Sequence, residues 1–317
     1  MFEVFAPARA DLAGGTLDLW PLYCLHPGSL TVNVALNTGV RLRLHQGGAP
    51  TGFIRHRSPD RSTREVSPAH ALSDLVAAVG FHFLPGGGFE VQVVDQPPVG
   101  SGLGGSSVLA VALAQACLAA TGRRLAARTL VAVLRDLEAG VLGVPTGVQD
   151  YYPALLGRPL ALHFSPGGER LERLTVGRRW LHERLLVVYS GISHSSGMVN
   201  WEVFRARVDG DPGVRAGLER IAAAARECRQ ALLIRDGDGV GRAIAAEWAA
   251  RRELAPVVSP PDIERIVSAG LTAGALAGKA CGAGGGGSVL FWVPPSRRDL
   301  VTNAVLEASG PGAYVVP

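Results

Sequence analysis

Residues 97–110, PPVGSGLGGSSVLA, combine closely spaced glycines with serine hydroxyls just before an apolar run. Glycine backbones let N–H groups approach an anion, and a helix beginning near Ser106 would point its positive N-terminal end at the same place. The loop is therefore a candidate cradle for nucleotide phosphates. Its residues are Gly100, Ser101, Gly102, Leu103, Gly104, Gly105, Ser106 and Ser107.

Two other nucleotide-binding interpretations of this loop are weaker, and a purely structural one stays open. The spacing of Gly100, Gly102 and Gly105 also fits a dinucleotide-binding turn, but that fold needs an acidic residue about 20 positions later. Residues 119–128, AATGRRLAAR, contain none. A Walker A site is excluded because the loop has no lysine. A serine-capped glycine turn without a ligand would explain the loop equally well if nothing else were considered.

Two carboxylates follow the loop. Glu138 shares a helical row with Leu130 and Leu134, at the edge of an apolar face. Asp150 closes PTGVQD, and we expect it to be a buried carboxylate that accepts or orients the proton of a substrate hydroxyl. Arg9 would keep that carboxylate ionised and stabilise charge on the alcohol oxygen. The sequence leaves open whether Asp150 abstracts the proton or only orients the hydroxyl.

Further polar and glycine-rich segments could line a substrate site. APARADLAGGTLDL (6–19) places Asp18 after a Gly14-Gly15 turn, and GKACGAGGGGS (278–288) precedes an apolar strand. The second segment is interpreted as a packed turn that approaches a ligand, with a flexible linker as the alternative. Lys279, the only lysine of the chain, has either a phosphate-binding or a structural role. His194 lies in YSGISHSSG, which could line a pocket or be a solvated loop.

The pattern of apolar residues predicts the elements that must position these groups. Strands are predicted at 2–7, 29–36, 39–45, 88–95, 184–191 and 288–293. Helices are predicted at 106–122, 128–143, 212–234, 240–254 and 260–275. Residues 55–68, rich in arginine, are predicted to be a solvated loop rather than a phosphate-binding patch. If the chain forms two lobes, the boundary between them is expected between Gly157 and Arg184.

Composition excludes several classes of protein. The length of 317 residues favours two lobes, and a content of 47% hydrophobic and 18% charged residues is typical of a globular protein. The net charge is +4 and the pI about 9.1, but the arginines are scattered, so no nucleic acid partner is expected. No leader pattern or long apolar run occurs, which predicts a cytoplasmic protein without a membrane partner. The four cysteines form no C-x-x-C pair and are expected to be reduced thiols.

Segments 6–19, 97–110 and 278–288 resemble, in order and spacing, the three signature motifs of the GHMP kinase superfamily. LEAGVLGVPTGVQDYYPALLG resembles its sugar kinases of the D-glycero-D-manno-heptose 7-phosphate kinase and fucokinase type. The resemblance implies an α+β, two-lobed fold. Residues 1–170 would form a mixed-sheet lobe similar to ribosomal protein S5 domain 2, and residues 171–317 a ferredoxin-like lobe. It also implies an ATP-dependent sugar or sugar-phosphate kinase, with a homodimer as one compatible state.

The same resemblance implies roles for individual residues. Ser106 and Glu138 would bind Mg²⁺, Asp150 and Arg9 would be catalytic, and Asp18 would bind sugar hydroxyls. Further sugar contacts are expected from Gly14, Gly15, Thr16, His194, Gly284 and Gly285. The chain departs from the pattern at Leu17, Tyr151 and Arg158, so the sugar is left undetermined. Two alternatives stay open: a kinase for mevalonate or homoserine, and a catalytically silent sugar-binding relative.

Overall fold

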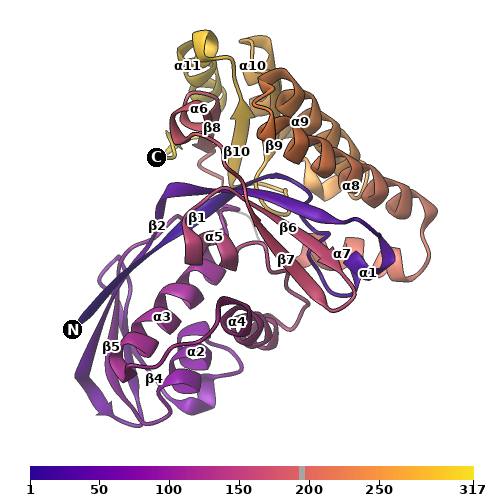
Figure 1. Ribbon diagram of the computed structural model, residues 1–317. Coiled ribbons are helices and arrows are strands. Elements are labelled where there is room, and N and C mark those ends of the chain that lie inside the picture. The colour runs from indigo at the N-terminus through magenta and orange to yellow at the C-terminus, as the bar shows by residue number, and fades with distance from the viewer. Residues whose placement is uncertain (193–196) are drawn as a thin grey trace. The chain divides into compact units, whose positions relative to one another are not determined.

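The computed structural model describes residues 1–192 and 197–317 (Figure 1). The chain forms two compact units, each assembled from separate stretches of sequence. The first unit contains Met1–Ala8, Leu36–Pro97 and Gly104–Gly157; the second contains Arg9–Ala35, Pro98–Leu103 and Arg158–Pro317. The chain passes from the second unit to the first between Leu103 and Gly104, so the glycine-rich loop contributes to both. The division into domains at 1–170 and 171–317 stays a prediction.

A mixed sheet contains the longest strands of the described chain. Its strands are β1 (Phe2–Ala13), β2 (Leu30–Thr51), β3 (Ile54–Arg57), β4 (Thr63–Val66), β5 (Gly87–Asp95), β6 (Leu160–Ser165) and β7 (Gly168–Arg173). Their order is β4-β3-β5-β2-β6-β7, with β1 paired to β2. The sheet is mixed because β3 and β5 run parallel, whereas the pairs β2–β5, β2–β6, β3–β4 and β6–β7 are antiparallel.

Strand β2 is one continuous strand where two were predicted. Gly39, between the predicted strands, has a packing role: a β-carbon there would lie 2.1 Å from the carbonyl oxygen of Ala6. The glycine therefore permits close approach of β1 and does not mark a turn.

In the first unit, helices cover one face of the sheet (Figure 1). These helices are α2 (Leu75–Phe83), α3 (Gly105–Thr121) and α4 (Ala127–Leu142), and a short α5 (Tyr151–Leu156) follows. Helix α3 is buried along most of its length, and both of its ends are glycines with positive φ, Gly104 and Gly122. The predicted helices at 106–122 and 128–143 are confirmed.

Residues 55–68, predicted to be a solvated loop, contribute instead to the antiparallel pair β3–β4. The reason is an alternation along β3: Ile54 and His56 are buried, whereas Arg55 and Arg57 are only partly buried. Arg55 pairs with Glu65 on the opposite strand at 2.9 Å. This pairing of opposite charges across the strands stabilises the hairpin.

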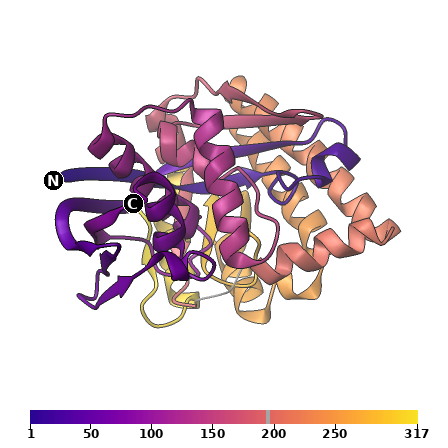
Figure 2. The same cartoon turned by 90° about the horizontal axis from the view of Figure 1, so that it is seen from below.

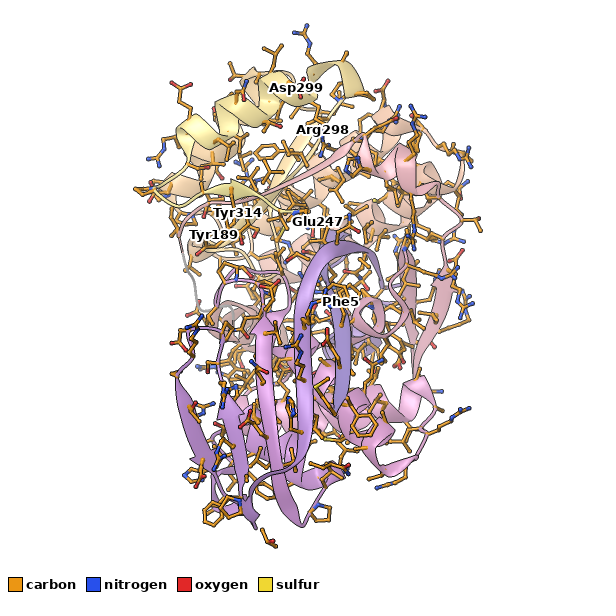
Figure 3. All side chains as sticks on the ribbon, turned by 90° about the vertical axis from the view of Figure 1, so that its left-hand side faces the viewer. Phe5, Tyr189, Glu247, Arg298, Asp299 and Tyr314 are labelled. Carbon is orange, nitrogen blue, oxygen red and sulfur yellow. The ribbon has the colours of Figure 1, made fainter. Side chains whose placement is uncertain are left out.

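The second unit contains an antiparallel sheet in the order β11-β8-β10-β9. Its strands are β8 (Leu185–Tyr189), β9 (Ala277–Ala280), β10 (Ser288–Trp292) and β11 (Tyr314–Val315). The predicted strands at 184–191 and 288–293 are thus confirmed. Tyr189 and Tyr314 lie side by side on the paired strands β8 and β11, with ring centroids 5.6 Å apart (Figure 3).

Helices make up most of the rest of the second unit. They are α1 (Leu22–Leu25), α6 (Arg178–His182), α7 (Gly197–Val208), α8 (Pro212–Leu233), α9 (Gly237–Arg252), α10 (Pro261–Thr272) and α11 (Arg298–Ala308). Helices α8 and α9 pack side by side (Figures 1 and 2). Ile263 of α10 and Val301 of α11 belong to the same apolar cluster as Phe291 of β10. Together the two sheets and their helices confirm the predicted α+β class.

Among the described residues, no helix has the length and apolar character needed to cross a bilayer.

Candidate active site

The N-terminal end of α3 brings a backbone turn and a carboxylate together. Gly104 precedes the helix with φ +78°, and a β-carbon at this residue would lie 3.0 Å from Oδ2 of Asp150. A β-carbon at the next residue, Gly105, would meet nothing within 4 Å. The first turn of α3 therefore has open space at Gly105 and a carboxylate beside Gly104. The open space suits an anionic ligand, and the adjacent carboxylate can accept a proton.

Glu138 of α4 accepts three hydrogen bonds from hydroxyl groups of the first unit. Ser106 Oγ donates to Oε1 at 2.5 Å, and Ser107 Oγ donates to Oε2 at 2.7 Å. The hydroxyl of Tyr151 also donates to Oε2. Burial raises the pKa of Glu138, and these hydroxyls offset part of that rise. The result is a cluster of oxygen atoms around one carboxylate.

Asp150 sits at the start of α5 and does not use its side chain to cap that helix. Asp150 is partly exposed, and not buried as expected from its sequence context. The reason is that the turn 145–150 lies largely at intermediate burial before α5 begins. A partly exposed carboxylate can be reached by a substrate hydroxyl, so this exposure is compatible with the expected acceptance or orientation of a hydroxyl proton.

In the second unit, Arg9 of β1 holds the other part of the glycine-rich loop. Its Nη1 donates to the carbonyl oxygen of Gly102 at 2.7 Å, and its guanidinium lies 3.7 Å from the Asp11 carboxylate. A β-carbon at Gly102 would lie 2.7 Å from the carbonyl oxygen of Cys281. The N–H of Ser288 donates to the carbonyl of Ser101 at 2.8 Å. The loop is thus fixed by Arg9 and by direct backbone contact with residues 281–288.

The turn at residues 14–18 is anchored from several sides. A β-carbon at Gly14 would lie 2.0 Å from the carbonyl oxygen of Leu30, so only glycine fits there. Leu17 is fully buried in an apolar cluster with residues of α8 and α9. Leu17 therefore anchors the turn, and the polar Thr16 and Asp18 on either side of it are also buried.

Two family models match the sequence. The model described as "GHMP kinases N terminal domain" matches residues 69–158, and "GHMP kinases C terminal" matches residues 224–311. Together they cover more than half of the chain.

The chain belongs to the GHMP kinase family.

Several known proteins are similar to it along nearly its whole length. A D-glycero-alpha-D-manno-heptose 7-phosphate kinase of Campylobacter jejuni is 24% identical over 96% of this chain and 93% of its own. The L-fucokinase/L-fucose-1-P guanylyltransferase of Bacteroides fragilis is 27% identical over 96% of this chain but only 36% of its own length. The crystal structure of a D-glycero-D-manno-heptose 1-phosphate kinase from Bacteroides thetaiotaomicron has a TM-score of 0.74 at 20% identity, covering 99% of this chain and 94% of its own.

In this GHMP kinase, Gly284 and Gly285 of the segment 278–288 pack directly against Val258. A β-carbon at Gly284 would lie 2.5 Å from the carbonyl oxygen of Val258, and the N–H of Gly285 donates to that oxygen at 2.7 Å. Lys279 is fully buried and ion-paired to Asp11 and Glu247, which favours the structural role over the phosphate-binding one. His194 lies outside the described residues.

Four residues of this kinase's candidate site region were not assigned a role from the sequence: Asp11, Tyr151, Glu247 and Arg251. Asp11 lies two residues after Arg9 in β1, a spacing that places both on one face of a strand. Glu247 and Arg251 are four residues apart in α9, which places them on one face of a helix. These spacings are visible in the sequence, but they do not reveal that the side chains are buried.

The oxygen cluster around Glu138 suits Mg²⁺, which prefers hard oxygen ligands and takes the rest of its shell from water and phosphate. Within residues 1–192 and 197–317 no group of three or more His, Cys, Asp or Glu side chains could hold a metal ion by itself. A magnesium ion at Glu138 would take the remaining ligands of its shell from hydroxyl, water or phosphate oxygens.

Proposed function

We propose that the chain transfers the γ-phosphate of Mg-ATP to a hydroxyl of a sugar or sugar phosphate. The acceptor is either a sugar of the heptose 7-phosphate type or the anomeric hydroxyl of a hexose. ATP follows from membership of a kinase family. The observation that supports the proposal most directly is the position of Asp150 beside Gly104, at the open N-terminal end of α3. The sugar acceptor is supported by the heptose and fucose kinases among the relatives.

The nucleotide phosphates would bind to the loop from Gly100 to Ser107. The backbone N–H groups at the start of α3 have no partners earlier in the helix and carry the positive end of its dipole. Open space at Gly105 leaves room for a phosphate oxygen close to the backbone. A phosphate here would be held by fixed N–H donors without any lysine in the loop.

Ser106 and Glu138 would hold the magnesium ion. When bound, Mg²⁺ neutralises charge on the phosphate oxygens. Tyr151 and Ser107 keep Glu138 Oε2 fixed by their hydrogen bonds, so the carboxylate is oriented before any ligand arrives.

Asp150 and Arg9 would act on the acceptor hydroxyl. Asp150 accepts or orients the hydroxyl proton while the alcohol oxygen attacks the γ-phosphorus and the bond to the β-phosphate oxygen breaks. Arg9 stabilises the charge that develops. Asp18 binds acceptor hydroxyls, with Gly14, Gly15, Thr16, His194, Gly284 and Gly285 as the remaining proposed sugar contacts.

Release of ADP over a panel of acceptors tests the proposal. The panel contains D-glycero-D-manno-heptose 7-phosphate, L-fucose, D-galactose and mevalonate, each with Mg-ATP. ADP release with a sugar and not with mevalonate is expected. In that assay Asp150→Asn should lower kcat by about 10²–10⁴-fold while Mg-ATP still raises the melting temperature. Asp136→Asn, the same change at an exposed residue of α4, is the control.

Each other outcome has a distinct meaning. Release of ADP with mevalonate alone would mean that the acceptor is a non-sugar alcohol. Sugar-dependent thermal shifts without ADP release would identify a silent sugar-binding relative. Full turnover by Asp150→Asn would remove this residue from the mechanism.

A further inference from the structure

A chain of buried charges runs through the second unit, from the glycine segments to the turn at residues 14–18. Its members are all nearly inaccessible to solvent, and they are Arg9, Asp11, Lys279, Glu247 and Arg251. Burying a charge is costly unless an opposite charge and hydrogen bonds compensate it. Such an arrangement therefore fixes its members in place.

The contacts pass from one member to the next. Asp11 accepts the N–H of Gly282 at 2.8 Å on Oδ1 and the ammonium of Lys279 at 3.1 Å on Oδ2. Lys279 reaches Glu247 Oε2 at 2.9 Å. Burial alone would raise the pKa of Asp11, but the charges of Lys279, Arg9 and Arg251 hold it below its usual value.

Arg251 is the end of this chain that contacts the turn. Its Nε and Nη2 donate to Glu247 Oε1 at 2.9 and 2.5 Å. Nη2 also donates to the carbonyl oxygen of Gly15 at 2.9 Å, and Nη1 donates to Thr16 Oγ1 at 3.2 Å. One guanidinium thus ties helix α9 to two successive residues of the turn.

Thr16 is held in a backbone conformation that it would not choose by itself. Its φ is +75°, a region that β-branched residues rarely occupy, so the surrounding contacts must hold it there. Its hydroxyl accepts from Arg251 and donates to Asn200 Oδ1 at 2.9 Å. The hydroxyl proton is therefore committed to Asn200, and a sugar cannot receive it without breaking that bond.

We propose that Arg251 is a positioning residue for the phosphoryl acceptor, an inference that rests on the proposed sugar kinase function. It holds Gly15 and Thr16 in one conformation, and so fixes the backbone from which the buried Asp18 would contact the acceptor. Thr16 is thereby reassigned from the sugar contact proposed above to a residue that fixes the turn, and Asp18 remains the proposed sugar ligand. Arginine is required because one planar group must serve Glu247 and both turn residues together, whereas lysine is a point charge on a flexible stem.

Arg251→Lys tests the proposal because it keeps the positive charge beside Glu247. The same change at the next residue, Arg252→Lys, is the control, since Arg252 is exposed and pairs with Glu264. Amide hydrogen exchange across residues 14–19 is measured first, without any ligand. Arg251→Lys should accelerate this exchange about tenfold, as expected for the loss of a charged hydrogen bond, and Arg252→Lys should not.

Kinetics of the same two variants are then measured with L-fucose, D-galactose and D-glycero-D-manno-heptose 7-phosphate. We expect Arg251→Lys to raise the acceptor KM about tenfold and to leave the KM for ATP within about twofold of the wild-type value. Thr16→Val is the second variant if Arg251→Lys does not fold, because it removes the hydroxyl but keeps the shape of the side chain. It should change exchange and acceptor KM in the same direction.

Unchanged exchange at residues 14–19 would overturn the proposal, as would an acceptor KM that changes no more than in Arg252→Lys. If the wild-type protein phosphorylates none of the three sugars, the sugar kinase function is what fails. The exchange result would still decide whether Arg251 holds the turn.

Discussion

The carboxylate of Asp150 borders the α-carbon of Gly104, so closely that a β-carbon on that glycine would come within 3.0 Å of Oδ2. The glycine is thus required for two reasons, its φ of +78° and the position of the acid. The second reason places the proposed phosphate-binding loop directly beside the proposed proton acceptor.

Gly104→Ala separates these two reasons when it is compared with Gly122→Ala. Gly122, at the other end of α3, has φ +68° and nothing within 4 Å of a β-carbon. Both variants should lose about 1–2 kcal/mol of unfolding free energy through backbone strain, measured by urea denaturation. Only Gly104→Ala should also lower kcat, because it displaces Asp150. Equal kcat values in the two variants would show that the Asp150 contact has no catalytic importance.

Gly105→Ala tests whether the open space at the start of α3 receives a phosphate. The added methyl group meets no protein atom within 4 Å, and alanine favours helix over glycine by up to about 1 kcal/mol. The free protein should therefore be at least as stable as wild type, while the melting-temperature rise caused by Mg-ATP should shrink or disappear. A full rise with Mg-ATP would place the phosphates elsewhere.

Tyr151→Phe and Glu138→Gln test the proposed role of Glu138 as a metal ligand. The first removes one hydroxyl that orients Glu138, and the second removes the negative charge itself. Both should raise the Mg²⁺ concentration needed for half-maximal activity, Glu138→Gln more strongly, since the carboxylate is the charged ligand of a hard cation. Titration of activity with MgCl₂ at fixed ATP measures this. Wild-type dependence in both variants would contradict the assignment.

Glu172→Gln tests the effect of pH on the second unit. The hydrogen bonds of Arg229 hold the pKa of Glu172 at about 2, against an ordinary value of 4.5. A depressed carboxyl pKa stabilises the folded state above pH 4.5, and this contribution is lost as pH falls toward 2. The variant should lose about 1 kcal/mol at pH 7 because the pair is close to the surface. Urea denaturation at several pH values should show that difference shrinking below pH 4.5; a constant difference would disprove the linkage.

Helices α3 and α4 of the first unit follow closely from local sequence, whereas α2, β3 and β4 do not. Helix α3 is apolar on every side and bounded by glycines, a pattern typical of a helix buried in a protein core. Glu138 could be selected because it interrupts an apolar row of α4. In both cases the informative residues are neighbours in sequence, so periodicity is sufficient to find them.

Long-range contacts could not be predicted in the same way. Asp11, Glu247 and Lys279 are far apart in sequence, and each alone is typical of a solvated surface. The close approaches of Gly102 to Cys281 and of Gly284 to Val258 depend on how distant segments pack, so the sequence does not reveal that these glycines are also packing positions. Arg55 and Arg57 concealed a strand because their charge outweighed the alternation of Ile54 and His56.

Lys279 is the only lysine of the 317 residues, and its side chain is fully buried. An amine-reactive reagent therefore finds no ε-amine on the folded chain. The rate at which Lys279 becomes labelled reports how often the second unit opens, so a single mass-spectrometric peak can measure its opening without any engineered probe.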